Sequence, residues 1–430
     1  MKYEKIPNSL FIKNRAKFTA RMQSGALAVF NSNDIFPTGA DSTLPFEQHS
    51  DIFYLSGVDQ EESILVLFPD AVDPKHREIL FLTETNEHIA IWEGAKLDKE
   101  AATATSGIKT IYWLQDFEKV FSELMFEAGL IYFNTNEHYR SVREVETRED
   151  RFIKKCKADF PAHKWERANP ILQEIRGVKE PEEIDLMQTA CDITNKGFRR
   201  ILPFVKPGVM EYEIEAEYIH EFLRNRSKGF AYTPIVGSGF SACVLHYIEN
   251  NQMCKDGDML LMDVGAEYAN YSSDMTRTIP VNGRFTERQK AVYNAVLRVK
   301  DLATEMLVPG TIWAEYHKEV GKLMTKELID LKLISKADVQ SEDPNWPAYK
   351  KYFMHGTSHH MGLDTHDYGA LKTPMKANMV FTVEPGIYIP KESMGIRLED
   401  DVVIQENGSP FNLMRDIPIQ VEEIEDLMNS

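Results

Sequence analysis

Three apolar, strand-like runs in the second half of the chain each end on an acidic residue. The first, residues 257–265, carries Asp263 near its end, and two later runs end on Glu384 and Glu399. A carboxylate at the end of a buried strand is costly unless it is paired or bound. The fold must therefore supply a partner for each of these acids.

Asp274 lies eleven residues after Asp263, in the segment 271–278, whose β-prone residues predict the return arm of a hairpin. Two acids carried on paired strands would then face one point. The pair alone fits solvated loop acids equally well, because Asp commonly occupies strand ends and turns. Other residues must decide between these two interpretations.

Residues 353–367 contain four of the chain's 12 histidines in a Gly-rich stretch. They are His355, His359, His360 and His366. A lone histidine more often forms a hydrogen bond in the core or at the surface, but clustered imidazoles beside carboxylates favour a metal or acid–base site. We expect His360, the chain neighbour of His359, to point away from that site.

The acids and one imidazole form an oxygen-rich, sulfur-free donor set: Asp263, Asp274, His359, Glu384 and Glu399. Such a set suits Mn²⁺ or a similarly hard cation and excludes a thiolate zinc site. With four carboxylates and one nitrogen, charge balance favours two divalent metal ions about 3.5–4 Å apart, bridged by carboxylates and by a water or hydroxide. That arrangement generates a nucleophile at neutral pH.

These segments, in the order D…D…H…E…E, resemble the metallopeptidases of the methionine aminopeptidase, prolidase and aminopeptidase P group, whose shared fold is called pita-bread. Bacterial aminopeptidase P is the most similar of them. The resemblance covers about residues 175–425 and lies in segments 235–247, 263, 274–278, 355–367, 382–386 and 397–401. Residues 48–57 and 91–94 resemble the amino-terminal domain of the same family.

The resemblance implies a role for each site residue. Asp263 would bind one metal ion, Asp274 and Glu399 would bridge the two, and His359 and Glu384 would bind the other. Glu384 would also act as the proton shuttle. The residues that would line the site and orient the scissile carbonyl and the proline are His246, His355, His366, Arg397 and Tyr388.

The activity that the resemblance implies is hydrolysis of the bond between an N-terminal residue and a following proline, by a metal-bridging hydroxide. The substrates would be peptides with proline at position two. The alternative is prolidase, which accepts only X-Pro dipeptides and differs in motif detail alone. The resemblance also implies a homodimer or homotetramer in which Asp41 and Trp92 help to shape a neighbouring subunit's entrance.

Two features depart from the bacterial pattern. Between His366 and Glu384 the chain has Lys372 and Lys376 but no arginine, where bacterial relatives often carry one that faces the substrate. Residues 335–349, polar and Pro-containing, are typical of a surface insertion. These departures concern the recognition of longer peptides and the rim of the site.

Other function classes fit less well. Residues 237–242 match G-x-G-x-x-A, but the strand-like run 243–247 follows where a phosphate-binding helix is required. A metal-free pita-bread binding module or a creatinase-like amidinohydrolase would be expected to have lost several metal ligands, whereas all five are present. A methionine aminopeptidase would usually be shorter and lack the N-terminal domain.

Composition limits the partners and the compartment. The net charge of −18, from 67 acidic and 49 basic side chains, repels phosphate backbones and anionic lipids, so neither nucleic acid nor a membrane is expected as a partner. Four cysteines without paired spacing suit reduced thiols in a cytosolic protein. The start of the chain lacks a signal peptide's apolar segment, and no apolar run could span a bilayer. The expected location is the cytoplasm.

The length of 430 residues predicts two or three domains. Strand-like runs alternate with helical periodicity in the first part of the chain, at 27–30, 64–68, 79–83, 101–106 and 116–128. A breaker-rich stretch at 168–181 ends this part, and Pro181 opens a long amphipathic helix toward Leu202. We therefore predict an α/β N-terminal domain at 1–174 and an α+β pita-bread catalytic domain at 175–430.

Overall fold

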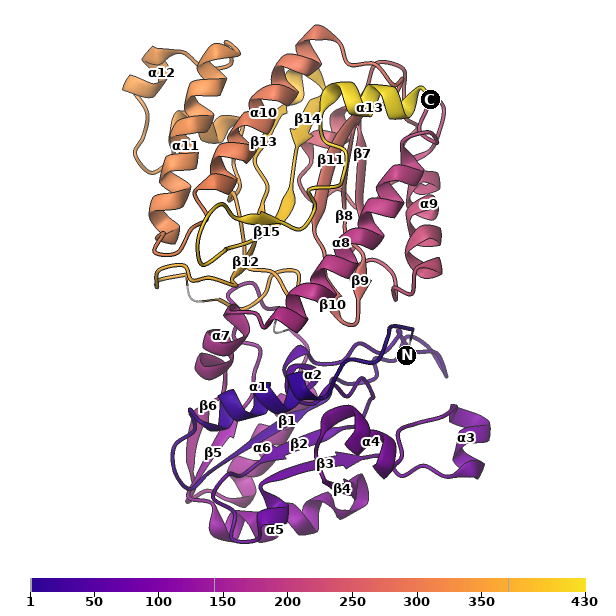
Figure 1. Ribbon diagram of the computed structural model, residues 1–430, viewed down its shortest axis with the longest axis vertical. Helices are drawn as coiled ribbons and strands as arrows, with labels where there is room; N and C mark the ends of the chain where they lie inside the picture. The colour runs from indigo at the N-terminus through magenta and orange to yellow at the C-terminus, as the bar shows by residue number, and fades with distance from the viewer. Residues whose placement is uncertain (1, 143, 370) are drawn as a thin grey trace. The chain divides into compact units, whose positions relative to one another are not determined.

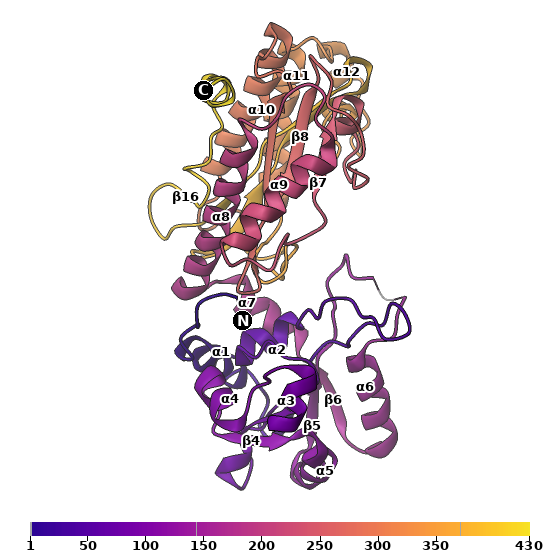
Figure 2. The same cartoon turned by 90° about the vertical axis from the view of Figure 1, so that its right-hand side faces the viewer.

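A computed structural model describes residues 2–142, 144–369 and 371–430 of the chain (Figures 1 and 2). The chain forms two compact units, an N-terminal unit at Lys5–Arg176 and a C-terminal unit that comprises Gly177–Ser430 and the first residues of the chain. In the C-terminal unit, the ring of Tyr3 packs edge-on against Tyr268 at 6.3 Å. The mixed α/β first part and α+β second part confirm the predicted fold classes.

The N-terminal unit contains a six-stranded mixed sheet in the order β4-β3-β2-β1-β5-β6. Its strands are β1 (Ala26–Asn31), β2 (Ile64–Leu67), β3 (Glu78–Leu82), β4 (Thr110–Trp113), β5 (Leu130–Phe133) and β6 (Lys164–Arg167). Its helices are α1 (Ser9–Thr19), α2 (Ser50–Ser56), α3 (Glu87–Glu93), α4 (Lys99–Ser106), α5 (Phe117–Glu127), α6 (Arg148–Asp159) and α7 (Asn169–Gly177). The predicted strands and helices of this part are thus confirmed, whereas α7 occupies a stretch in which only breakers were recognised.

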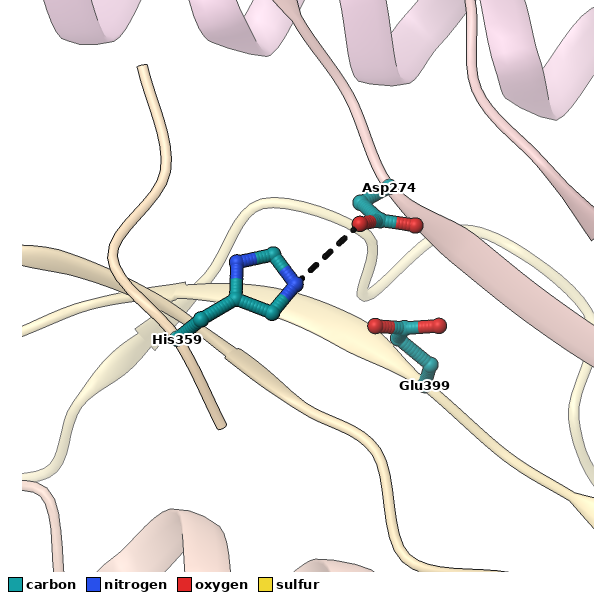
Figure 3. A group of neighbouring side chains, drawn as sticks. All are labelled: Asp274, His359 and Glu399. Carbon is teal, nitrogen blue, oxygen red and sulfur yellow. Dashed lines mark ion pairs between the residues drawn. The ribbon is translucent and has the colours of Figure 1, made fainter. Parts of the chain in front are cut away.

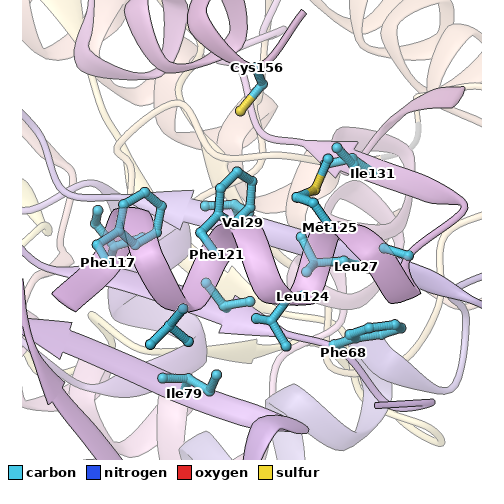
Figure 4. Packing of buried hydrophobic residues seen from close by; sticks show 14 of the residues in the cluster. Leu27, Val29, Phe68, Ile79, Phe117, Phe121, Leu124, Met125, Ile131 and Cys156 are labelled. Carbon is cyan, nitrogen blue, oxygen red and sulfur yellow. The ribbon is translucent and has the colours of Figure 1, made fainter. Parts of the chain in front are cut away.

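Strand β1 is buried on both of its faces. Because side chains alternate along a strand, Leu27 and Val29 join the core under α5, where Phe121 packs (Figure 4). Phe30 points the other way and meets Phe18 of α1 at 5.2 Å. The apolar run of β1 therefore reflects helices on both sides of the sheet.

The C-terminal unit begins with two long helices, α8 (Pro181–Ile201) and α9 (Glu211–Arg224). Proline at the first position of α8, acids in its first turn and arginines in its last turn stabilise it at both ends. The other helices are α10 (Glu287–Glu305), α11 (Trp313–Asp330), α12 (Lys336–Gln340) and α13 (Val421–Met428). Helices α8 and α9 pack together, as do α10 and α11, and Figure 1 shows the strands of the unit between these two pairs.

Two three-stranded sheets, β11-β8-β7 and β12-β15-β16, and two hairpins form the β layer of this unit. The strands are β7 (Ile235–Ser238), β8 (Met259–Val264), β9 (Glu267–Tyr268), β10 (Tyr271–Ser272), β11 (Met275–Pro280), β12 (Val380–Val383), β13 (Gly386–Ile389), β14 (Met394–Arg397), β15 (Asp400–Val403) and β16 (Phe411–Asn412). Strand β11 pairs antiparallel with β8, and Thr276 lies opposite Asp263. The predicted hairpin return is therefore confirmed.

One strand prediction is wrong. Residues 243–247 do not form a strand: a short 3-10 helix at Gly239–Cys243 is followed by a turn. The amide groups of Ser238 and Gln252, which flank this segment, donate to the carboxylate of Glu211 instead of to a neighbouring strand. The G-x-G-x-x-A segment therefore precedes a turn and no α-helix.

The stretch 335–349, the cysteines and the helices can each be compared with the sequence predictions. The stretch 335–349 carries the short α12 and is mostly exposed. All four cysteines are free thiols, as predicted, and three of them are buried. Among the described residues, none of the helices combines the length and the apolar character needed to cross a bilayer.

Glu149, in the first turn of α6, is a buried acid that links this helix to β1. Its two carboxylate oxygens accept from the backbone N–H and the side-chain amide of Asn31, at 2.8 and 2.9 Å. Burial raises the pKa of Glu149 to about 8; the Asn31 hydrogen bonds oppose this shift and the charge of Asp51 adds to it. The folded N-terminal unit therefore keeps a proton that the unfolded chain releases near pH 4.5.

We predict that the stability of the N-terminal unit falls as pH rises from about 5 to about 8. Glu149 has a raised pKa in the folded state, so its contribution is complete at low pH and is lost as pH rises through about 8. The slope should reach up to about 1.4 kcal/mol per pH unit in the free energy of opening, measured by hydrogen exchange of the β1 amides. Glu149→Gln should remove most of this slope, whereas Glu123→Gln on the exposed side of α5 should keep it. An unchanged slope in Glu149→Gln would contradict the assignment.

Candidate metal centre

Asp274, His359 and Glu399 form a buried group in the C-terminal unit. One ligand atom from each lies within 4.8 Å of the other two (Figure 3). Asp274 precedes β11, Glu399 joins β14 to β15, and His359 lies in the loop before β12. Three segments far apart in the sequence therefore meet at one point, as the order of acids and histidine predicts.

Two hydrogen bonds to Thr382 of β12 hold the backbone of His359 and so help to orient its imidazole. Its amide donates to the hydroxyl of Thr382 and its carbonyl accepts from the Thr382 amide, both at 3.1 Å. Its Nδ1 lies 3.0 Å from the carbonyl oxygen of His360, which only accepts, so Nδ1 carries a proton. Its Nε2 then points at Asp274 Oδ2, 3.4 Å away, and approaches Glu384 Oε1 at 3.7 Å.

That geometry indicates what must lie between the groups. An imidazole that donates from Nδ1 presents a lone pair at Nε2, and a lone pair facing carboxylates is stable only with a proton or a cation in between. Burial lowers the pKa of His359, but the carboxylates of Asp274 and Glu384 outweigh it and raise the pKa. The donor set therefore fits a divalent metal ion, which would replace that proton.

Asp263 joins the group through shared partners. The hydroxyl of Tyr232 lies 2.7 Å from Asp263 Oδ1 and 2.6 Å from Asp274 Oδ1, so its single proton serves one carboxylate at a time. The guanidinium of Arg397 pairs with the other oxygen of Asp263. The two strand-borne acids thus face one point, and the solvated-loop interpretation is wrong.

A chain of hydrogen bonds connects Glu399 to the rim of the site. Thr276 donates to Glu399 Oε2 at 2.6 Å and accepts from Arg397 Nε at 3.0 Å. Arg397 Nη1 donates to the hydroxyl of Tyr388 at 2.9 Å, and that hydroxyl donates to His355 Nε2 at 2.8 Å. The orientation of each of these groups therefore depends on its neighbour.

The predicted rim histidines lie at different depths. His355 Nδ1 donates to the carbonyl oxygen of Gly356 at 2.8 Å and lies 3.6 Å from Glu384 Oε2. The exposed ring of His366 lies 4.2 Å from that of His359. His246 is exposed and near enough for its charge to help lower the pKa of His355. His360 points away, as predicted, and its ring packs at a tilt against that of Phe381, with centroids 4.3 Å apart.

Burial shifts the ionisation of the whole group. It raises the pKa of Glu384 to about 7, against the charges of His359 and Arg397. Burial and the charge of Asp274 raise the pKa of Glu399 well above its usual range. Burial also raises the pKa of Asp263. Without a cation the charged forms of these carboxylates are disfavoured, and bound divalent cations would favour them.

Three residues of this network were not identified from the sequence: Tyr232, Thr276 and Asp401. Asp401 is fully buried and accepts from the Asp274 amide at 3.0 Å, and the Cys191 thiol lies 3.4 Å from the same oxygen. The acid run 399–401 was a usable signal for Asp401. Tyr232 lies in an irregular segment before β7 and gave no periodic signal.

Comparisons with known proteins cover nearly the whole chain. The model of metallopeptidase family M24 matches residues 185–406, and that of the aminopeptidase P N-terminal domain matches residues 11–132. The chain is 33% identical to a Xaa-Pro aminopeptidase of Haemophilus influenzae, covering 99% of this chain and 98% of that protein. The Xaa-Pro aminopeptidase of Escherichia coli is 34% identical, with 98% of each chain covered.

A solved aminopeptidase P structure is also similar to this chain along nearly its full length. Zinc-substituted Escherichia coli aminopeptidase P in complex with product has a TM-score of 0.88 and 31% sequence identity, with 99% of each chain covered. Both units of this chain therefore have counterparts in a protein that is crystallised with a metal.

We predict that a divalent metal ion raises the melting temperature of the protein. Removing the mutual repulsion of the carboxylates stabilises only the folded state, by about 2.7 kcal/mol at a metal concentration a hundred times Kd. Calorimetry with Mn²⁺ and after chelation should show this rise, and Asp274→Asn should lose most of it. Asp426→Asn, on the exposed face of α13, is the matched control and should keep it. Equal melting temperatures of the wild-type protein with and without metal would contradict the assignment.

Proposed function

The chain belongs to metallopeptidase family M24 and carries an aminopeptidase P N-terminal domain, and we propose that it removes the N-terminal residue from peptides whose second residue is proline. It is a metal-dependent aminopeptidase whose C-terminal unit has the pita-bread fold. The observation that carries the proposal is the buried group of Asp274, His359 and Glu399 beside Glu384. Similarity to Xaa-Pro aminopeptidases along the full chain supports this activity over prolidase.

We propose that the centre holds two divalent ions, Mn²⁺ in the working enzyme. Asp263 would bind one, Asp274 and Glu399 would bridge both, and His359 and Glu384 would bind the other. When bound, such a pair lowers the pKa of water and polarises a carbonyl oxygen. The hardness of a set of four carboxylates and one imidazole supports manganese.

Glu384 is the proposed proton shuttle. Its amide donates to the carbonyl oxygen of Thr357 at 2.8 Å, which fixes the residue at the end of β12. The raised pKa of its carboxyl group suits a group that takes a proton from the attacking water and delivers it to the leaving proline nitrogen. His355, whose pKa burial lowers to about 3, stays neutral at the edge of this carboxylate.

The substrate's proline would lie near His246, His366 and Tyr388. Tyr388 is fully buried, and its hydroxyl is bonded to Arg397 and His355, so its position is fixed. A rigid wall of this kind favours a ring that is itself rigid. A prolyl nitrogen also carries no hydrogen in the peptide bond, so it needs no acceptor in the site.

The N-terminal unit has an exposed apolar segment that supports a role in assembly. Trp92 has 81% of its surface exposed and its neighbour Ile91 has 76%. We propose a homodimer or homotetramer in which Trp92 and Asp41 border a neighbouring subunit's site. The cytoplasm is the compartment that the four free thiols support.

Glu384→Gln should lower kcat at least about a hundredfold and change KM little, because it removes a charge and a proton carrier but keeps the side chain's shape. Steady-state kinetics of metal-loaded protein on an X-Pro-X tripeptide measures this, with metal content determined on the same sample. Glu423→Gln on the exposed face of α13 makes the same chemical change and should leave both constants unaltered. Near wild-type turnover in fully loaded Glu384→Gln would show that another group moves the proton.

Two tripeptides that differ only in Pro or Ala at the second position test the proline requirement. Alanine brings an N–H without an acceptor and loses the ring's contacts, so kcat/KM should fall at least roughly tenfold to a hundredfold. Both peptides and the matching X-Pro dipeptide should be assayed on one manganese-loaded sample. Equal values for Pro and Ala would refute the proline assignment, and cleavage of the dipeptide alone would identify a prolidase.

A further inference from the structure

Glu211, at the start of α9, is a fully buried carboxylate outside the metal centre. One of its oxygens accepts from the amide and the hydroxyl of Ser238, at 2.7 and 2.8 Å. The other accepts from the hydroxyl of Tyr247 and the amide of Gln252, at 2.8 and 2.9 Å. Four neutral donors thus satisfy one buried charge, which is an unusually complete arrangement.

All of these donors lie in or immediately beside a single irregular segment, residues 239–252, which we call the His246 loop. The loop has one short 3-10 turn and no strand. The backbone of Glu211 adds another bond, because its own amide donates to the carbonyl oxygen of Gln252 at 3.0 Å. Glu211 therefore provides, for this loop, the hydrogen bonds that a neighbouring strand would provide in a sheet.

The other side of the loop packs against the proposed active site. Tyr247, Leu245 and Ala242 form an apolar cluster with Tyr388. The contact is close: a Cβ atom built on Gly395 of β14 would lie 1.9 Å from the carbonyl oxygen of Ala242. A shift of the loop therefore moves His246 relative to Tyr388.

We propose that Glu211 is a positioning residue that holds His246 at the substrate site. This inference rests on the proposed function, in which His246 orients the substrate. Glu211 would act through its bonds to both ends of the loop and to the hydroxyl of Tyr247, next to His246. No other described acid on α9 bonds donors on both sides of His246.

The choice of variant follows from the donors. Glu211→Gln keeps the volume but replaces one acceptor oxygen by an NH₂ group, so the amide of either Ser238 or Gln252 loses its acceptor. Glu215, one helical turn later, accepts from one partner in the described part of the chain, the side chain of Asn250, at 3.0 Å. Glu215→Gln retains an oxygen for that donor and is the matched control.

The test is a double-mutant cycle on kcat/KM for an X-Pro-X tripeptide, with Glu211→Gln, His246→Ala and the double variant, all loaded with manganese. We expect Glu211→Gln to lose roughly tenfold to a hundredfold, with the same division between kcat and KM as His246→Ala. In the His246→Ala background the second change should cost less than about twofold, because the group being positioned is absent. Metal content and Glu215→Gln should match wild type.

Each other result overturns the proposal. Equal losses from Glu211→Gln in both backgrounds would mean a general structural role, and no loss in the wild-type background would mean no role. If His246→Ala alone is fully active, the proposed function of His246 fails and the positioning role fails with it.

If Glu211→Gln does not fold, Tyr247→Phe replaces it in the cycle. It removes one bond to Glu211 and keeps the ring on Tyr388, so a smaller loss that vanishes in His246→Ala is expected, and an additive loss refutes the proposal.

Discussion

The concentration of negative charge at one buried point determines most of the C-terminal unit. Asp263, Asp274, Glu384 and Glu399 come from the ends of several strands; Asp274 and Glu399 are buried, and Asp263 and Glu384 are partly buried. Arg397 neutralises one of them directly. Carboxylates packed this way repel one another strongly in a medium of low polarity, so the arrangement is stable only with protons or cations between them. The surrounding sheets, loops and helices hold the four carboxylates close together.

Three adjacent acids show how the fold assigns different tasks to similar side chains. Glu399 faces the metal centre, Asp400 pairs with the buried Arg277 at 2.6 Å, and Asp401 accepts the amide of Asp274. Burial raises the pKa of Asp400, but its cationic partners outweigh this and hold it below its usual range. The alternation of side chains along the strand sends neighbours to opposite faces, so one short run supplies a proposed ligand, a structural ion pair and a support for a second proposed ligand.

The sequence was informative where a residue type and a periodic pattern coincided. Apolar runs predicted β8 and β12, and the acids that end them, Asp263 and Glu384, lie where the runs predict. Tyr232 was not predictable, because its partners lie 31 and 42 residues away and its own segment has no regular pattern. The segment 243–247 was misjudged for a related reason: its spacing is that of a strand, but its flanking donors bond to a carboxylate from α9. Pairing with a side chain distant in sequence leaves no local signature.

The number of protein donors on a carboxylate distinguishes its task in this fold. Glu211 accepts four hydrogen bonds from neutral groups and has no capacity left for an external ligand. Asp400 likewise accepts from Arg277, a lysine and an asparagine. Among the described residues Glu399 accepts one hydrogen bond, from Thr276, and Glu384 has only imidazoles near its oxygens. A buried carboxylate oxygen with few hydrogen-bond donors is costly unless a cation binds to it. The acids with the fewest donors are therefore the ones suited to bind a metal ion. This shortage of donors, and not the depth of burial, separates Glu399 and Glu384 from the structural acids Glu211 and Asp400, which are at least as deeply buried.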